Sequence, residues 1–399
     1  MKKILIVINT LGHAGAEAAL LELLRRLDPK EYEVFLYVIM GQGEMVHELP
    51  EHVKLLNRHY SDTSVLSREG KGHMTGQVLK AMVRRGTVIR LLPYLVKNLS
   101  AMTKKRQLMV DKLLWRVLSD GGQRLKEHYD LAVAYLEGGS TYYVADHVDA
   151  DKKAAFLHVD YSRAGYTRAL DKDCYLGYDK VFTVSDEVKD SFLKVYPECQ
   201  QKTEVFHNLL DQEKIRRKAK EPGGFADDYQ GVRLLSVGRL TDQKAYPVSI
   251  EAMKLLKEKG VQARWYVLGE GNQRGLLEEK IRALGLEEDF LLLGAKENPY
   301  PYMAQADIYV HASRYEGKSI AIQEAQTLGC AMVVSDCSGN REQVVNGVDG
   351  ILCRLEPEAV CDSILELLRE EEKRRRLGRA ASEKPLANES EINKLLSMI

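Results

Sequence analysis

The chain lacks several features that would have placed it in a class at once. Its 399 residues contain no run of about 18 apolar residues, so no helix of this sequence is expected to span a bilayer. The six cysteines form no Cys-x-x-Cys pair and no His-Glu-x-x-His motif occurs, so neither a disulfide framework nor a zinc site is predicted. The initial apolar stretch, residues 4–8, is too short for a signal peptide and is predicted to be a buried strand. A reducing cytoplasm fits these absences best.

Net charge is also lacking, because 58 Lys and Arg balance 58 Asp and Glu. Nucleic-acid-binding domains are strongly basic, so no nucleic-acid partner is expected. The charge is unevenly distributed, however. Residues 71–126, the basic segment, hold 13 Lys or Arg and two acids, an excess of +11, whereas the remainder holds 45 basic and 56 acidic residues, a net of −11.

Short apolar, β-branched runs alternate with segments of helical periodicity, which predicts βαβ units and parallel sheets. Strands are expected at residues 3–8, 33–40, 130–136, 153–158, 180–184 and 202–206, then at 232–237, 264–268, 290–293, 307–311 and 331–335. A helix is also expected over residues 161–170. The two series predict two doubly wound, Rossmann-like α/β domains that face a central cleft.

The predicted domain boundaries follow from a charged stretch around Pro222-Gly223-Gly224. The N-terminal domain is expected at residues 1–207, a linker at 208–231 and the C-terminal domain at 232–383. Residues 384–399 are expected to form a helix that packs back toward the N-terminal domain. Ligands of doubly wound sheets bind at the carboxyl ends of the strands, so polar residues following the predicted strands are the candidates for a site.

Two carboxylates eight residues apart follow the strand expected at 307–311. Between Glu316 and Glu324 lie Gly317, Lys318 and Ser319. Gly317 permits close backbone approach, Ser319 is expected to cap the following helix, and the exposed amides of a helix N-terminus attract anions. The alternative interpretation is a capped helix with two solvated acids.

Two cations follow the strand expected at 232–237. Arg239, within Gly238-Arg239-Leu240, and Lys244 would stand at the carboxyl end of that strand. An Arg makes forked contacts with phosphate and a Lys supplies a point charge, so the pair suits a diphosphate. An ordinary charged surface loop remains the alternative.

Weaker signals lie in the first half of the chain. A turn with Gly12 and Gly15 opens the first helix and can approach a phosphate or sugar, although it matches neither a dinucleotide fingerprint nor a P-loop. His158 ends the strand expected at 153–158, where either a site residue or a structural histidine would fit. Asp171-Lys172-Asp173 resembles a metal-binding pair but is expected to be surface charge.

Taken together, these motifs resemble the retaining glycosyltransferases of family 4, which have the GT-B fold. The family's Glu-x₇-Glu motif matches Glu316 and Glu324, its Gly-Arg-Leu…Lys motif matches Gly238 to Lys244, and the glycine loop and His158 have counterparts there. The resemblance is strongest over residues 232–355. The residues after Glu316-Gly317 depart from the family, so the resemblance does not fix the donor sugar.

The resemblance implies a role for each residue. Arg239 and Lys244 would hold the donor diphosphate in place of a metal, Glu316 would contact the sugar hydroxyls, and His158 would stabilise charge during transfer. The remaining donor contacts would come from Gly15, Gly238, Ala295, Gly317, Lys318, Ser319 and Glu324, with Glu324 on the ribose and Ala295 near the base. No metal and no cofactor are expected.

The implied activity is transfer of a hexose, with retention, from a nucleotide sugar to a lipid-linked or polysaccharide acceptor in cell-surface glycan synthesis. A UDP-sugar is favoured as the donor and a GDP-sugar is possible. The alternatives are another GT-B enzyme, such as a nucleotide-sugar epimerase or a phosphorylase, and a non-catalytic nucleotide-sugar-binding protein.

The basic segment has two interpretations. Apolar and cationic residues alternate there with helical spacing, and Gly86 and Pro93 are expected to divide it into two or three helices. A basic amphipathic helix suits an anionic membrane surface, which predicts a cytoplasmic protein that binds the membrane peripherally. The alternative is a set of core helices with a solvated cationic face.

Overall fold

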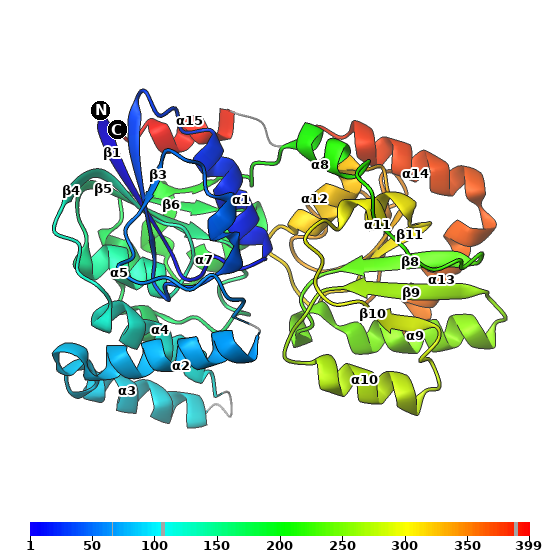
Figure 1. The fold of residues 1–399 in the computed structure, drawn as a ribbon, viewed down its shortest axis with the longest axis horizontal. Helices are drawn as coiled ribbons and strands as arrows, with labels where there is room; N and C mark the ends of the chain where they lie inside the picture. Colours follow the sequence, from blue (N-terminus) through cyan, green and yellow to red (C-terminus); the bar gives the residue numbers. More distant parts are fainter. Residues whose placement is uncertain (66, 105–107, 387–389) are drawn as a thin grey trace. The chain divides into compact units, whose positions relative to one another are not determined.

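The computed structural model describes residues 1–65, 67–104, 108–386 and 390–399. These residues form two compact units (Figure 1). Unit 1 comprises Met1–Leu209 and the C-terminal helix α15 (Ser390–Leu396), and unit 2 comprises Leu210–Leu386. The charged stretch after residue 210 contains helix α8 (Gln212–Lys218), which packs on α11 (Tyr300–Gln305) and α12 (Ile320–Thr327) of unit 2.

Within the described residues, the sheet of unit 1 has seven parallel strands in the order β3-β2-β1-β4-β5-β6-β7. They are β1 (Lys2–Ile8), β2 (Tyr32–Val38), β3 (Val53–Leu55), β4 (His128–Ala134), β5 (Asp149–Leu157), β6 (Lys180–Thr183) and β7 (Thr203–Val205). Both faces of β1 are buried: Ile4 and Ile6 pack in one core and Leu5 and Val7 in the other. Burial on both faces explains why these strands read as continuous apolar runs.

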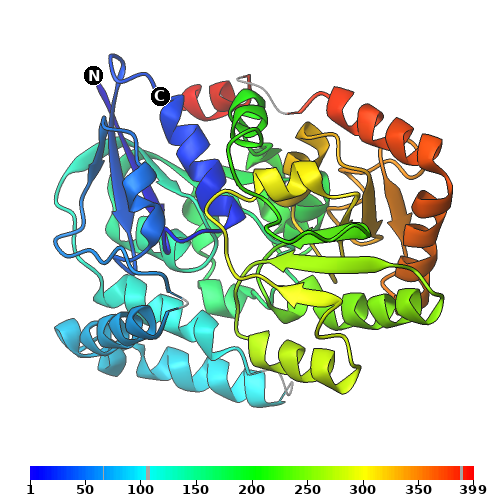
Figure 2. The same cartoon turned by 45° about the vertical axis from the view of Figure 1, so that its right-hand side comes forward.

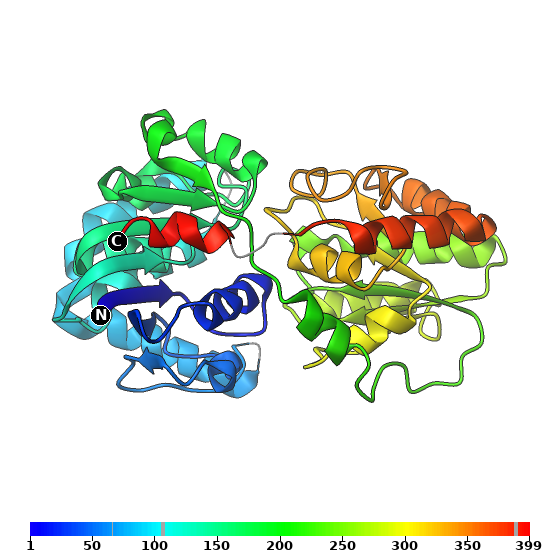
Figure 3. The same ribbon diagram turned by 90° about the horizontal axis from the view of Figure 1, so that it is seen from above.

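Helices cover both faces of this sheet. They include α1 (Gly15–Arg25), α5 (Gly139–His147) and α7 (Asp186–Leu193). The C-terminal helix α15 joins them: the backbone N–H of His207 donates to Glu391 Oε2 at 2.9 Å, and Lys394 Nζ donates to the carbonyl of Val205 at 2.8 Å. Figure 3 shows α15, in red, among the elements of unit 1.

The basic segment forms α2 (Arg68–Val83), α3 (Thr87–Lys104) and α4 (Val110–Gly121), which pack against one another beside the sheet of unit 1 (Figure 1, Figure 2). The break at Gly86 is confirmed, because Arg85 and Gly86 have φ of 55° and 64°. The expected break at Pro93 is wrong. Pro93 lies inside α3 on its exposed side, where the missing N–H removes one helix hydrogen bond and the flanking turns persist. Lys105 and Arg106 lie outside the described residues.

Two further expectations for unit 1 are wrong. The helix expected at 161–170 is reduced to α6 (Arg168–Asp171), because Gly165 has a φ of 82° that interrupts a helix. Asp171 is not surface charge: it is fully buried, and Tyr142 Oη donates to its Oδ1 at 2.7 Å. Burial raises the pKa of Asp171 to about 7.

The sheet of unit 2 has, in the part of the chain that is described, six parallel strands in the order β10-β9-β8-β11-β12-β13. They are β8 (Val232–Val237), β9 (Ala263–Leu268), β10 (Phe290–Leu292), β11 (Ile308–His311), β12 (Met332–Ser335) and β13 (Ile351–Cys353). The helices around it, besides α8, α11 and α12, are α9 (Tyr246–Glu258), α10 (Arg274–Ala283), α13 (Pro357–Arg369) and α14 (Glu371–Glu383). The predicted pair of doubly wound α/β domains is confirmed.

Candidate active site

The site in unit 2 is created by the pairing of two strands that are 70 residues apart in sequence. β8 pairs in parallel with β11, through Leu234 with Ile308 and Leu235 with Tyr309. Parallel strands end at the same edge of a sheet, so the loops that follow them meet. This pairing brings Lys244, from the loop after β8, to Glu316, from the loop after β11, with Nζ 2.6 Å from Oε1.

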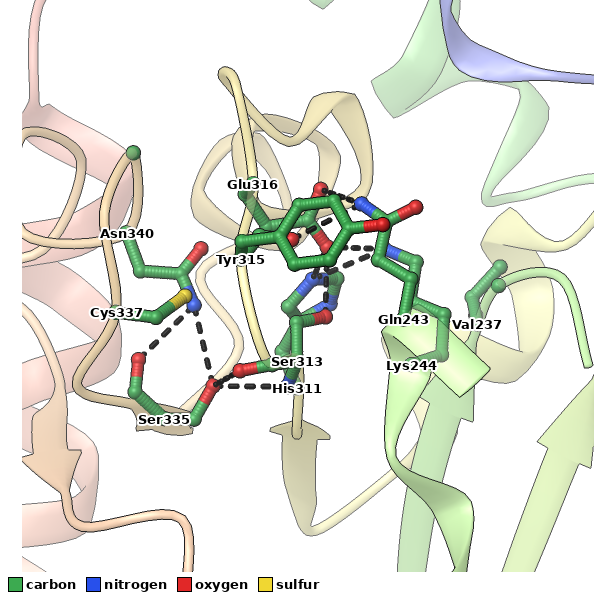
Figure 4. Close-up of polar contacts among 12 residues, drawn as sticks. Val237, Gln243, Lys244, His311, Ser313, Tyr315, Glu316, Ser335, Cys337 and Asn340 are labelled. Atoms are coloured by element: carbon green, nitrogen blue, oxygen red, sulfur yellow. Dashed lines mark hydrogen bonds and ion pairs between the residues drawn. The ribbon is translucent and has the colours of Figure 1, made fainter. Parts of the chain in front are cut away.

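The carboxylate of Glu316 is buried and surrounded by hydrogen-bond donors (Figure 4). Besides Lys244, Ser313 Oγ donates to Oε1 at 2.6 Å, His311 Nε2 lies 3.2 Å from Oε1, and Gln243 Nε2 donates to Oε2 at 3.4 Å. Burial alone would raise the pKa of Glu316, but Lys244 and His311 outweigh it and hold the pKa well below its usual range. Glu316 is therefore a fixed, ionised acceptor.

His311 and Ser313 are site residues that the sequence interpretation missed. Lys244 Nζ lies 3.2 Å from His311 Nε2, and Tyr309 Oη lies 3.2 Å from His311 Nδ1. Burial and the Lys244 ammonium lower the pKa of His311, and the Glu316 carboxylate opposes this shift only partly. A signal was present: His311 ends the buried strand β11, His158 directly follows β5, and the rule that selected His158 would also have selected His311.

The loop that carries Glu316 is braced by the loop after β12. The N–H of Ser313 donates to Ser335 Oγ, which donates to the Ser313 carbonyl, both at 2.8 Å. Asn340 Nδ2 donates to the Ser335 carbonyl at 2.9 Å. Gly339 has a φ of 76°, and a Cβ there would lie 2.4 Å from the carbonyl oxygen of Gly317, so only glycine fits.

Gly238 and Arg239 lie at the end of β8, beside Lys244. Tyr246 Oη donates to the Gly238 carbonyl at 3.0 Å, and a Cβ on Gly269 would lie 2.0 Å from that oxygen. The loops after β8 and β9 are therefore in close backbone contact. Arg239 is exposed, and none of the described carboxylates forms an ion pair with it. Its guanidinium remains available at this edge of the sheet.

Helix α12 follows the Glu316 loop. Gly317 and Lys318 precede it, and Ser319 is its N-cap residue and is buried. The expected side-chain cap is wrong, because the Ser319 hydroxyl makes no capping hydrogen bond. The first backbone N–H groups of α12 therefore do not donate hydrogen bonds to the Ser319 hydroxyl.

Glu324 lies in α12, where Tyr300 Oη donates to its Oε1 at 2.8 Å. Burial raises the pKa of Glu324 to about 7, and the hydrogen bond from Tyr300 opposes this rise only partly. Ala295, the predicted neighbour of the base, is exposed in the loop after β10. Glu316 and Glu324 thus have opposite electrostatic environments, one with a cation and one without.

The remaining predicted residues, Gly15 and His158, belong to unit 1. Gly15 is the first residue of α1, directly after the β1 loop. The N–H of His158 donates to Glu137 Oε2 at 3.0 Å, and its ring packs on Tyr135 at 5.0 Å between centroids. Burial lowers the pKa of His158 to about 4, so the ring is neutral. Its Nε2 is buried and has no hydrogen-bond partner among the described residues.

The fold and the site together define a class: a tandem of doubly wound units with a Lys–Glu pair and an exposed Arg at a strand-end edge. The comparisons agree with this class. Residues 216–384 match the family model described as Glycosyl transferases group 1. The structure of Anabaena HepE in complex with UDP-glucose superposes with a TM-score of 0.68 at 16% identity and covers 100% of both chains. The chain has the predicted GT-B fold.

Curated relatives match part of this chain at higher identity than that solved structure does. The N-acetylgalactosamine-N,N'-diacetylbacillosaminyl-diphospho-undecaprenol 4-alpha-N-acetylgalactosaminyltransferase of Campylobacter jejuni is 35% identical over 176 residues, 44% of this chain and 46% of that protein. The UDP-Gal:alpha-D-GlcNAc-diphosphoundecaprenol alpha-1,3-galactosyltransferase of Escherichia coli is 28% identical over 184 residues, 44% of this chain and 47% of that protein. The aligned segments span less than half the length of each relative.

Proposed function

We propose that the chain is a retaining hexosyltransferase that transfers a sugar from a nucleotide sugar, preferably a UDP-sugar, to a lipid-linked acceptor in glycan synthesis. The observation that carries this proposal is the Lys244–Glu316 pair beside Arg239 at the strand-end edge of unit 2. The similarity of residues 216–384 to group 1 glycosyl transferases supports it. Relatives named for diphosphoundecaprenol acceptors support the acceptor class.

In the proposed reaction, the bond between the anomeric carbon and the diphosphate breaks and negative charge develops on the leaving nucleotide. Arg239 and Lys244 stabilise that charge, so no metal is required by the proposal. To reach a phosphate, Lys244 Nζ must leave Glu316 Oε1 and His311 Nε2, the two partners it has in this structure. Ser313 and His311 remain to hold Glu316, which accepts hydrogen bonds from the sugar hydroxyls.

The configuration of the anomeric carbon is retained if the acceptor attacks it from the same face of the sugar from which the phosphate departs. The acceptor hydroxyl then forms the new bond to the anomeric carbon and gives its proton to the departing phosphate oxygen. Glu316 is assigned to hold the sugar hydroxyls and is not assigned as a nucleophile. Neutral His158, with its unpartnered Nε2, is proposed to contact the donor sugar, and Glu324 to accept from the ribose.

The test is nucleotide release from a panel of UDP-, GDP- and ADP-sugars, with and without a polyprenyl-diphosphate-linked sugar. We expect one UDP-sugar to be consumed at a rate that rises at least tenfold with the acceptor present. Conversion of the nucleotide sugar without acceptor would indicate an epimerase. Sugar transfer that requires inorganic phosphate and no nucleotide would indicate a phosphorylase. Binding without any turnover would leave only a nucleotide-sugar-binding protein and would contradict the proposal.

We further propose that unit 1 binds an anionic membrane surface through α3. None of the helices in the described part of the chain is long and apolar enough to cross a membrane. On α3, Ile89, Leu92, Val96 and Leu99 form an exposed apolar stripe at spacings of three and four residues. Arg90, Lys97 and Lys104 flank it. Apolar residues beside cations on one helix suit the headgroup region of anionic lipids.

A further inference from the structure

A cavity of about 460 Å³ lies in unit 1 where the basic segment meets the sheet. It is bounded by the residues that follow β2 and β3, by the C-terminal half of α2 and by the end of α4. Its position at the carboxyl ends of two parallel strands is where doubly wound sheets bind ligands. Its volume is within the range of small-molecule sites.

The lining of this cavity is cationic. Arg58, Lys80 and Arg84 line it together with His59, and none of the described lining residues is acidic. Among the described residues, no carboxylate forms an ion pair with Arg58, Lys80 or Arg84. Three unneutralised cations around one hollow are the complement of an anion that carries two or more charges.

Several other cations of unit 1 already have partners, unlike Arg58, Lys80 and Arg84. Arg116 forms an ion pair with Asp146. Arg85 Nη1 donates to the carbonyl of Gly122 at 2.9 Å, and Arg124 Nη2 donates to that of Asp120 at 2.8 Å. Arg58, Lys80 and Arg84, which line the cavity, are thus among the cations that have no ion-pair partner in the described structure.

The walls of the cavity are held rigidly. Asn57 Oδ1 accepts from the N–H of Val38 at 2.9 Å, and its Nδ2 donates to the Val38 carbonyl at 2.7 Å. Gln123 Oε1 accepts from the N–H of Arg58 at 3.2 Å. A Cβ on Gly121 would lie 2.3 Å from the carbonyl of Ala81, so glycine lets α4 approach α2 closely here. A preformed cationic cavity binds an anion without first being ordered.

The rim of the cavity is apolar on one side. Val83 lines the cavity, and Leu79 lies one turn before it on the same face of α2; they are 81% and 58% exposed. Exposed aliphatic side chains beside a cationic hollow fit a ligand with a charged head and a hydrocarbon tail. We propose that this cavity binds the phosphate or diphosphate head of an amphiphile, whose alkyl chain leaves over Leu79 and Val83.

Two sources supply this chemistry, the diphosphate of a lipid-linked acceptor and the headgroup of a membrane phospholipid. The first source rests on the proposed function, whereas the second does not. Both require the same cations, so one set of variants tests the cavity and the choice of probe separates the sources.

The experiment is calorimetric titration of the full chain with inorganic pyrophosphate, with saturating UDP present to occupy the nucleotide site. The cavity variant is Arg58→Gln/Lys80→Gln/Arg84→Gln. The matched control is Lys30→Gln/Lys194→Gln/Arg282→Gln, which removes the same charge from exposed positions that lie outside both the cavity lining and α3. We expect the cavity variant to bind pyrophosphate at least tenfold more weakly than the wild type and the control to stay within twofold. Equal affinity in both variants would overturn the proposal.

Two further probes identify the source. Weaker binding of geranyl diphosphate by the cavity variant alone assigns the cavity to a prenyl-diphosphate acceptor, and Leu79→Ser/Val83→Ser should then weaken geranyl diphosphate but not pyrophosphate. Selective loss of binding to phosphatidylglycerol vesicles assigns it to a lipid headgroup. Unchanged binding of both probes would contradict the proposal. Failure of UDP to bind the wild type would instead count against the proposed function, whatever pyrophosphate does.

Discussion

At the scale of single residues, Lys244 has two partners, Glu316 and His311, that it would have to leave in the proposed donor complex. Its ammonium neutralises buried Glu316 and lies 3.2 Å from His311 Nε2. A buried ion pair stores little net stability, but removing one partner leaves the other charge uncompensated. Lys244 and Glu316 should therefore have opposite effects on nucleotide binding although they form one pair.

We expect Lys244→Ala to weaken UDP binding and to lower the transfer rate about 10²–10³-fold, because one preorganised donor to the developing charge is lost. Glu316→Gln should lower the rate while UDP binds as tightly as to the wild type or more tightly, since Lys244 is released toward the phosphate. Titration calorimetry and initial rates measure both. Lys254→Ala is the control, because Lys254 lies on α9 and pairs with Glu258. Equal UDP affinity in wild type and Lys244→Ala would contradict this account.

The raised pKa of Glu324, about 7, predicts that donor affinity depends on pH. In the proposed donor complex the ribose hydroxyl donates to the ionised carboxylate of Glu324, so binding of an intact UDP-sugar should strengthen between pH 6 and 8. The intact donor is the right probe because its diphosphate does not titrate in this range. Tyr300→Phe removes the hydrogen bond that lowers the pKa of Glu324. In this variant the rise in donor affinity should therefore occur at higher pH than in the wild type. Glu324→Gln should bind weakly with no pH dependence, and a wild-type affinity that is flat from pH 6 to 8 would refute the assignment.

The same shift has a consequence for stability. A carboxyl whose folded pKa lies above its unfolded value favours folding at low pH, and that contribution is lost as pH rises through the folded pKa. Glu324 therefore costs stability above about pH 7, whereas Glu316, with a lowered pKa, contributes stability that is lost only as pH falls below its unfolded value. Such opposed carboxyls are typical of a functional site.

Part of this site could be predicted from the sequence and part could not. Lys244 and Glu316 follow apolar runs within recognisable motifs, so their strand-end positions are local information. Their contact with each other depends on the pairing of β8 with β11, which alternation of strands and helices suggests but does not specify. Ser313 and Gln243 carry no motif. Ser313 contacts Glu316 within one loop, whereas Gln243 contacts it from the loop after β8.

At the scale of elements, α4 shows that the basic segment is more than a solvated face. Arg116 is 1% exposed, forms an ion pair with Asp146 of α5, and stacks 3.8 Å from the ring centre of Tyr142. Its Nη2 also donates to the carbonyl of buried Asp171 at 2.9 Å. Helical periodicity predicted the helix, but the burial of one cation depends on partners 30 and 55 residues away.

We expect Asp146→Ala to destabilise unit 1 by about 3 kcal/mol, because Arg116 remains buried without a counter-charge. This figure is at the lower end of the usual range because the Asp146 side chain is 42% exposed. Arg116→Met should cost less, since the remaining carboxylate can be solvated. Lys97→Met on exposed α3 is the control and should stay within about 0.5 kcal/mol. The midpoint of urea denaturation measures all three, and a larger loss for Arg116→Met than for Asp146→Ala would reverse the reasoning.

Two short strands were missed. β3 and β13 have three residues each, too few for a periodic pattern, although β7 and β10 are equally short and were predicted. The longer strands were found because burial on both faces makes each of them a continuous apolar run.

At the scale of the whole molecule, the net charge of zero combines two charge distributions of opposite sign. The cations of the basic segment lie in three environments. Arg116 is buried in unit 1 and paired with Asp146, and Lys80 and Arg84 line the cavity. Arg90 and Lys97 flank the apolar stripe of α3. Net charge governs association with charged surfaces rather than the fold, so only the exposed share should matter for a membrane.

We therefore expect the full chain to co-sediment with phosphatidylglycerol vesicles and not with phosphatidylcholine vesicles, and to be released by salt, because each cation near an anionic surface contributes about 1 kcal/mol. Ile89→Ser/Val96→Ser should abolish most of this binding, because both side chains are exposed on the stripe, at 79% and 59%. The matched control is Leu276→Ser/Val345→Ser, which removes two exposed apolar side chains of unit 2 and should leave binding unchanged. If wild type and both variants sediment equally with either lipid, α3 is a solvated face and the membrane assignment is wrong.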